Sequence, residues 1–141
     1  MAAYVPIDLH RHRSVVMHMA DDGTVQGWVR LANDPETLVA EVLKAGEAPE
    51  VAIEATYGWY WAVDALQAAG ANVHLVAPSK VGAFDGRRVK NDQRDCRLLG
   101  DLLRADAHGA HAFGIETNFD FITRAADDGD ARHALELLES P

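Results

Sequence analysis

The hydrophobic period of this chain changes at Asp34-Pro35, and that change limits the folds that the chain can adopt. Before this point, three apolar segments (residues 4–9, 14–20 and 24–31) are separated by short turns, one of which is Asp21-Asp22-Gly23. Such segments are typical of an antiparallel strand meander. After it, Asp34 can cap a helix with Pro35 at its first position, and apolar residues recur at helical spacing.

Strands and helices alternate along the rest of this region. A strand at residues 51–54 precedes a helix at 58–69, and another strand follows at 72–77. A loop rich in glycine, lysine and arginine (79–90) leads to a last helix from about residue 91 to residue 105. The predicted order is β-β-β-α-β-α-β-α, which indicates an α/β fold with a mixed sheet and helices packed on it.

The composition excludes several classes of protein. With 141 residues, of which 48% are hydrophobic and 25% charged, the chain is expected to be soluble and globular. No apolar run approaches the ~18 residues of a membrane-spanning helix, and the N-terminus has no signal-peptide pattern. We therefore expect a cytoplasmic protein with no membrane partner. The single cysteine excludes an intrachain disulfide and a zinc ribbon.

Negative charge is concentrated near the C-terminus. The chain has 22 acidic and 13 basic residues, and its net charge of −9 argues against a general nucleic-acid coat protein. Residues 106–141 hold eight acidic and two basic residues, so six of the nine net negative charges lie there. We therefore divide the chain into a domain over residues 1–105 and an acidic tail over residues 106–141.

Four carboxylates occupy positions where an acidic residue is costly. Asp8 lies inside the first apolar strand, and Glu54 ends the strand at 51–54. Asp92 and Asp95 share the side of the last helix that continues into its leucine stripe. Carboxylates beside a core are unfavourable unless they are paired or bind a cation, and Mg²⁺ or Mn²⁺ prefers such ligands. The alternative is a separate structural role for each, such as Asp92 at a helix N-terminus.

Aromatic and histidine residues lie close to these carboxylates. The aromatic residues at 57–61 follow Glu54 directly, and packing against the sheet is favoured over stacking on bases. His10, His12 and His18 alternate along the first hairpin and are predicted to share one face. They could ligate a metal, but we favour scattered surface histidines, and His108 and His111 near the C-terminus have no recognisable metal-ligand spacing.

Several sequence blocks occur in an order that is specific to one family. These are Ile7-Asp8-Leu9-His10, Leu31-Ala32-Asn33-Asp34-Pro35-Glu36, Glu54-Ala55-Thr56-Tyr57-Gly58-Trp59-Tyr60-Trp61 and Arg88-Val89-Lys90-Asn91-Asp92-Gln93-Arg94-Asp95. Together they closely resemble the N-terminal domain of the DEDD-type insertion-sequence transposases. These are relatives of the Piv invertase, and some are guided by a bridge RNA. The resemblance covers roughly residues 4–105.

The resemblance implies an RNase H-like domain similar to the RuvC Holliday-junction resolvase. Its four acidic residues bind divalent metal, Mg²⁺ or Mn²⁺, and they match Asp8, Glu54, Asp92 and Asp95 in this chain. The implied activity is DNA transposition and recombination by phosphodiester cleavage and strand exchange. The implied partners are DNA at transposon ends and targets, a guide RNA in some members, and a second copy or a full-length transposase.

Basic residues flank the carboxylates on both sides. Beside a metal site they are expected to contact the phosphate backbone of DNA or guide RNA, and the alternative is a solvated charged surface. The candidate nucleic-acid-binding residues are Arg11, Arg13, Arg87, Arg88, Lys90 and Arg94.

One part of the family pattern is unmatched. Family members continue into a long helical segment and a second domain that supplies a nucleophilic serine, and nothing of that length follows Ala105. A truncated copy is therefore expected, and enzymatic activity of the chain alone stays open. The alternatives are an inactive fragment that binds nucleic acid or a transposase, and a stand-alone metal-dependent nuclease. Cys96 replaces a small alanine and is expected to be buried.

Overall fold

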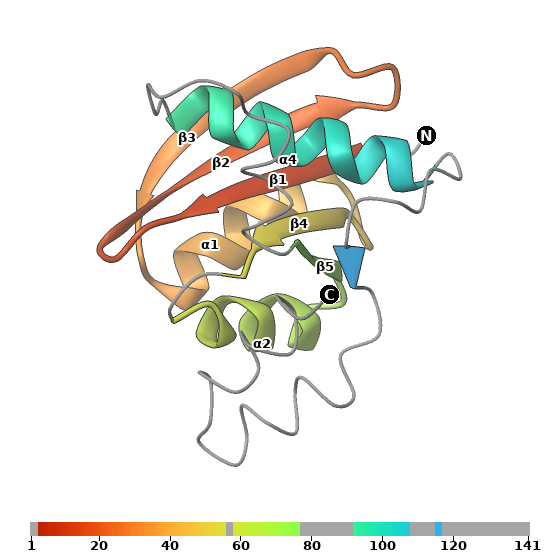
Figure 1. Cartoon of the computed structure of the whole chain (residues 1–141). Helices are drawn as coiled ribbons and strands as arrows, with labels where there is room; N and C mark the ends of the chain where they lie inside the picture. The colour runs from red at the N-terminus through yellow and green to blue at the C-terminus, as the bar shows by residue number, and fades with distance from the viewer. Residues whose placement is uncertain (1–2, 56–57, 77–91, 108–114, 117–141) are drawn as a thin grey trace.

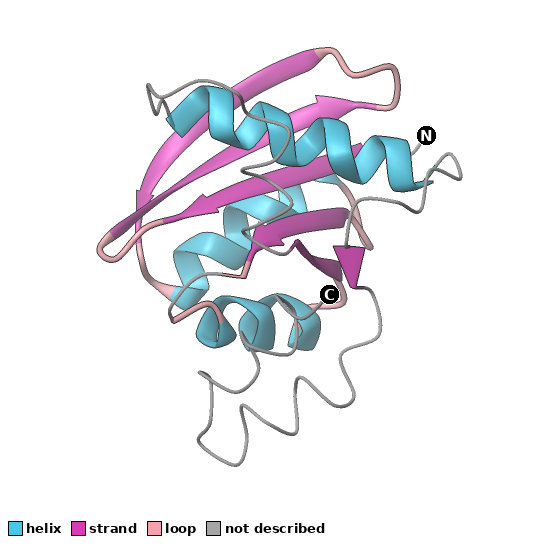
Figure 2. Cartoon of the chain, in the orientation of Figure 1, coloured by secondary structure: helices cyan, strands magenta, loops and turns pink. Residues whose placement is uncertain are grey.

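The structure is a computed structural model that describes residues 3–55, 58–76, 92–107 and 115–116. These residues form a six-stranded mixed sheet of order β3-β2-β1-β4-β5-β6, with helices on both of its faces (Figures 1 and 2). The elements in chain order are β1 (Ala3–Leu9), β2 (Arg13–Ala20), β3 (Val25–Ala32), α1 (Pro35–Val42), the 3₁₀ turn η1 (Leu43–Ala45), β4 (Glu50–Glu54), α2 (Tyr60–Ala68), β5 (Asn72–Val76), α4 (Asp92–Ala107) and β6 (Ile115–Glu116).

The first three strands form the predicted antiparallel meander. The turn between β2 and β3 contains Gly23 at a positive φ of 91°, a conformation that glycine adopts at little cost. The Asp22 side chain accepts a hydrogen bond from the Thr24 backbone N–H at 2.9 Å and closes the turn. The turn chemistry that the sequence indicates is therefore the one that the structure uses.

Two crossover helices connect the parallel part of the sheet. β4 pairs in parallel with β1, and β5 with β4, while α1 and α2 cover one face. Asp34 caps α1 as predicted, because its carboxylate accepts a hydrogen bond from the Thr37 backbone N–H at 2.9 Å. Trp59, at the start of α2, is buried against this face and Trp61 packs beside it, as predicted. Tyr60 is instead exposed, and Tyr57 lies outside the described residues.

The opposite face of the sheet is covered by α4 (Figure 1). Successive strand residues point to opposite faces, so each strand contributes to both cores. Ile7 and Ile53 pack toward α1 and α2, whereas Met17 packs with Leu99 of α4. Cys96 is fully buried in this second core, as expected for a small apolar residue.

The structure also has features that the sequence pattern does not predict. β6 adds a sixth strand, antiparallel to β5, inside the segment treated as an acidic tail. α4 continues to Ala107, so the boundary predicted at residue 105 falls within a helix. α2 begins at Tyr60, two residues later than predicted, and residue 77 lies outside the described residues. None of the described helices is long and apolar enough to span a membrane.

Candidate metal and nucleic-acid site

Asp8 is a buried carboxylate at the C-terminal end of β1. Only 6% of the residue is exposed, and its register partner on β2 is Val15. Directly paired residues of antiparallel strands share a face, and Val15 belongs to the core under α4. Asp8 therefore lies on the α4 side of the sheet. His10 donates a hydrogen bond from Nε2 to Asp8 Oδ2 at 2.8 Å, and this bond offsets part of the cost of burying the carboxylate.

Glu54 occupies the equivalent position on the neighbouring parallel strand. Ile7 of β1 is in register with Ile53 of β4, so the next residue on each strand is an acid, Asp8 and Glu54 respectively. Glu54 alternates with Ala52, which packs under α4, and so it lies on the same face as Asp8. The structure thus brings two of the predicted residues together at the C-terminal ends of adjacent parallel strands, where open α/β sheets bind ligands.

The start of α4 contributes the other two predicted carboxylates. Cys96 donates from Sγ to the backbone carbonyl of Val15 at 3.2 Å, so this part of the helix lies over the residue paired with Asp8. Asp95 precedes Cys96 and is half-buried. Asp92 is the first residue of α4, but its side chain lies outside the described ones.

The donor set fits a hard divalent cation. Carboxylate oxygens are the ligands that Mg²⁺ prefers, and it commonly keeps several waters and binds only one or two protein carboxylates. The buried carboxylate of Asp8, next to a second carboxylate at the same sheet end, supplies such donors. Among the described side chains, no three His, Cys, Asp or Glu groups stand close enough together to hold a metal ion by themselves.

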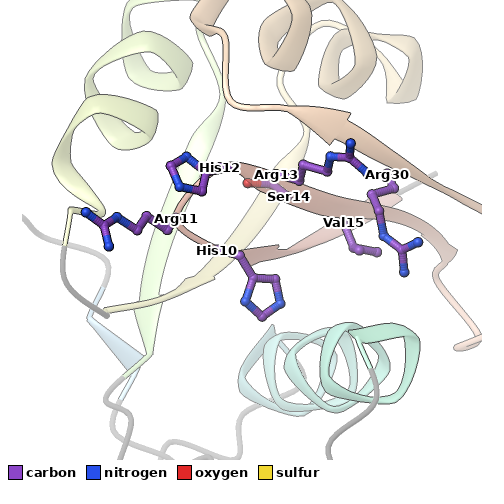
Figure 3. Close-up of a pocket in the computed structure, with 7 residues that line it drawn as sticks. All are labelled: His10, Arg11, His12, Arg13, Ser14, Val15 and Arg30. Carbon is purple, nitrogen blue, oxygen red and sulfur yellow. The ribbon is translucent and has the colours of Figure 1, made fainter.

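A basic pocket of about 570 Å³ is lined in part by His10 and Val15, the hydrogen-bond partner and the register partner of Asp8 (Figure 3). Residues 10–15, from the β1–β2 turn and the start of β2, line it together with Arg30 of β3. Arg11 and Arg13, both predicted to contact phosphate, are exposed in this pocket. Arg94 is half-buried on α4, while the predicted contacts Arg87, Arg88 and Lys90 lie outside the described residues.

Arg30 is a pocket residue that the sequence pattern did not single out. It is the register partner of Val15, which in turn pairs with Asp8, so Arg30 lies in the same cross-strand row as the buried carboxylate. The only sequence signal is its alternation with Trp28 along the third apolar segment. That signal does not indicate that Arg30 lies near Asp8, because the two residues are aligned only when β1, β2 and β3 pair in register.

Asn33 holds the turn that carries the pocket. Its side-chain amide nitrogen donates to the His10 carbonyl at 2.6 Å, and its Oδ1 accepts from the Ser14 hydroxyl at 2.6 Å. Its backbone N–H also donates to the His12 carbonyl at 3.0 Å. Asn33 is thus bonded to residues on both sides of Arg11 and Arg13, and it sets the shape of the turn.

The prediction that His10, His12 and His18 share one face is wrong. His18 points to the opposite side of the sheet, where its Nε2 donates to Glu41 Oε2 of α1 at 2.8 Å. His10 and His12 lie in the β1–β2 turn, beyond the strands, and line the basic pocket. The alternation of side chains along a strand does not continue through a turn, so the sequence spacing of the three histidines does not place their side chains on one face of the sheet.

The class of protein follows from the fold. Two solved structures of RuvC from Thermus thermophilus share it, each with a TM-score of 0.53. One is a complex with a Holliday junction substrate; it is 13% identical and the match covers 78% of this chain and 98% of that chain. The other is 14% identical, with 78% of this chain and 96% of that chain covered. At such identities the likeness establishes the fold alone, an RNase H-like fold of the RuvC type.

The family follows from the sequence itself. Residues 5–118 match the family model of the IS110-type DEDD transposases, described as transposase, and the chain belongs to that family. This match extends past the boundary predicted at residue 105 and includes β6. A comparison with curated protein sequences found no match. The family resemblance inferred from the sequence blocks is confirmed, and so is the α/β fold class.

Proposed function

We propose that this chain is a divalent-metal-dependent nuclease domain of a transposase, which cleaves DNA phosphodiester bonds during transposition. Asp8, Glu54, Asp92 and Asp95 are the proposed metal ligands, with Mg²⁺ or Mn²⁺ as the ion. The observation that carries the proposal is the position of two acids, Asp8 and Glu54, each directly after the register pair Ile7–Ile53 on adjacent parallel strands and on one face of the sheet. Membership of the transposase family supports the same chemistry.

In this proposal some side chains of the site bind the metal and others bind the substrate. When bound, divalent cations would supply the positive charge that stabilises the attacking and leaving oxygens of a phosphodiester displacement. The hydrogen bond from His10 holds Oδ2 of Asp8 and so fixes the orientation of that carboxylate. Arg11 and Arg13, exposed in the adjoining pocket, would contact the phosphates next to the scissile bond.

The proposed substrate is DNA at transposon ends and target sites. The basic pocket supports it, since the chain as a whole is acidic and this concentration of arginines is local. The RuvC structure solved with a Holliday junction shows that a domain of this fold can engage branched DNA. We further propose a guide RNA and a second copy or a full-length transposase as partners in the complete reaction.

The test is cleavage of labelled DNA by the purified chain. Branched and linear DNA carrying a transposon end should be cut in Mg²⁺ or Mn²⁺ and left intact in EDTA. Asp8→Asn and Glu54→Gln should lower the rate by about 100-fold or more, as expected for loss of a group that stabilises the transition state. Glu47→Gln is the matched control, because Glu47 is exposed and precedes the opposite end of β4.

Each outcome of the cleavage test has a defined meaning. Cleavage that persists in EDTA or in Asp8→Asn would overturn the proposed metal site. DNA binding by the wild-type chain without any metal-dependent cleavage would instead favour the alternative function, an inactive nucleic-acid-binding domain.

A further inference from the structure

The edge strand β3 carries an exposed aromatic side chain next to the basic pocket. Trp28 is 41% exposed, although tryptophan side chains are highly buried on average. Its register partner is Met17, which lies in the core under α4, so Trp28 is on the same sheet face as the pocket. β3 is the outermost strand on this side of the sheet. A ligand can therefore reach the Trp28 ring from the sheet edge.

Arg30 links the Trp28 ring to the pocket. Its guanidinium carbon lies 5.9 Å from the centroid of the Trp28 ring, within cation–π range, and Arg30 also lines the pocket. The two residues are separated by one position on the strand and so share a face. An aromatic surface and a cationic surface are thus continuous along β3.

The pocket has the charge of a phosphate site. Three arginines and two histidines line it, and none of its seven lining residues, all within the described part of the chain, is acidic. Figure 3 shows Arg11 at the opposite end of the group from Arg13 and Arg30, so the positive charge is not confined to one point of the pocket. Such spacing suits consecutive phosphates of a nucleic-acid strand better than a single small anion.

We propose that Trp28 and the arginine pocket form a binding site for unpaired nucleotides, in which a base stacks on Trp28 and the flanking phosphates contact Arg30, Arg13 and Arg11. The inference rests on the proposed function in one respect, that the substrate is a nucleic acid, and it requires no metal. In a duplex the base faces are covered by their neighbours. Only an unpaired or displaced nucleotide can offer its face to an aromatic side chain. A DNA duplex that is opened near Asp8 would present such unpaired nucleotides.

The competing explanation for Trp28 is contact with a protein partner. The charges favour nucleic acid, because an exposed tryptophan in a protein interface does not require a neighbouring pocket lined by arginines. The site would accept single-stranded DNA or RNA equally by this chemistry, since stacking and phosphate contact occur with both. The experiment therefore measures both kinds of strand.

The experiment measures the affinity of the full chain for short fluorescent strands. Polarisation is recorded with a fifteen-nucleotide dT strand, the corresponding U strand and a blunt DNA duplex of the same length, all in EDTA. Trp28→Ala should weaken binding of both single strands by about 5- to 100-fold and change duplex binding less than about two-fold. Trp28→Phe, which keeps an aromatic face, should restore most of the affinity. Arg30→Gln should also lower the salt dependence of single-strand binding.

Two control variants match these changes. Tyr60→Ala removes an equally exposed aromatic ring, 41% exposed at the start of α2, and Lys44→Gln removes one positive charge beside α1, on the other face of the sheet. Both should leave single-strand binding unchanged. Far-ultraviolet circular dichroism and thermal unfolding establish that each variant is folded. As a direct readout, the dT strand should quench tryptophan emission in the wild type and quench it far less in Trp28→Phe.

The inference is overturned if Trp28→Ala binds single strands as tightly as the wild type does, or if it loses single-strand and duplex affinity equally. A preference for only one of the dT and U strands would identify the natural source of the nucleotide. Because metal is absent, this test is independent of cleavage. If the chain fails to cleave DNA but binds single strands through Trp28, the proposed nuclease activity is wrong and the proposed nucleotide-binding site is still supported.

Discussion

The thiol of Cys96 donates to the backbone carbonyl of Val15 at 3.2 Å, and this contact joins two segments that lie 81 residues apart in the chain. Val15 is the register partner of both Asp8 and Arg30. This contact, together with the packing of Leu99 and Leu103 on Met17, places the acidic start of α4 near the buried carboxylate on one side and the basic pocket on the other. Val15 of β2 therefore lies between a candidate metal ligand, Asp8, and a candidate phosphate-binding residue, Arg30.

Gly100 is predicted to be required for the close packing of α4 on the sheet. A Cβ at this position would lie 2.7 Å from the Met19 Cε and 3.0 Å from the Pro6 Cγ, and the proline ring cannot move aside as a flexible side chain can. Gly100→Ala should destabilise the protein by about 1–3 kcal/mol, despite the better helix propensity of alanine. Urea unfolding provides the measurement.

Gly27→Ala is the control for this prediction, because nothing lies within 4 Å of a Cβ built on Gly27. It should change stability by less than about 0.5 kcal/mol. A stabilising Gly100→Ala would mean that α4 does not pack as closely as described.

Asn33→Ala should loosen the turn that carries the basic pocket. It removes the hydrogen bonds to the His10 carbonyl and the Ser14 hydroxyl, and the expected loss of stability is about 1–2 kcal/mol. Nucleic-acid affinity should fall as well, because Arg11 and Arg13 lose their fixed spacing. Thermal unfolding and polarisation measure the two effects. Gln26→Ala, at an exposed position of β3, should produce neither of them.

Glu41 is predicted to make stability depend on pH in the acid range. Burial acts to raise the pKa of Glu41, but hydrogen bonds from Lys44 and His18 outweigh it and lower the pKa below its ordinary value of 4.5. The unfolded chain therefore binds this proton more readily than the folded chain. The stabilisation is complete above pH 4.5 and is lost as the pH falls through the folded-state pKa.

The measurement is the free energy of unfolding of Glu41→Gln and the wild type across this pH range. The variant should be less stable by about 1–2 kcal/mol at pH 7, and the difference should shrink as the pH falls below 4.5. Glu36→Gln, an exposed glutamate on the same helix, should show no such convergence. A constant difference at all pH values would contradict the prediction.

Divalent metal is predicted to stabilise the folded chain whether or not cleavage occurs. Ligands that bind only the folded state raise its stability, by about 2.7 kcal/mol at a hundred times the Kd. Mn²⁺ should therefore raise the melting temperature of the wild type and have little effect on Asp8→Asn. An equal shift in both proteins would place the bound metal away from Asp8.

Local patterns in the sequence predicted much of the architecture. The turn at residues 21–23, the cap at Asp34 and the alternation of apolar residues each depend on near neighbours, and each is found where it was predicted. β6 was not predicted, because a two-residue strand has too little pattern of its own and depends on pairing with β5. The orientation of His18 was predicted wrongly, since a turn separates it from His10 and His12.

The sequence by itself determined the transposase family, the α/β fold class and the unusual acids at Asp8 and Glu54, because these are recorded in residue types and short spacings. Only the tertiary structure decided that Arg30 and Trp28 belong beside the basic pocket and that Asn33 holds its turn. The physical reason is strand register. Cross-strand hydrogen bonds align residues distant in the chain, and no local pattern specifies that alignment.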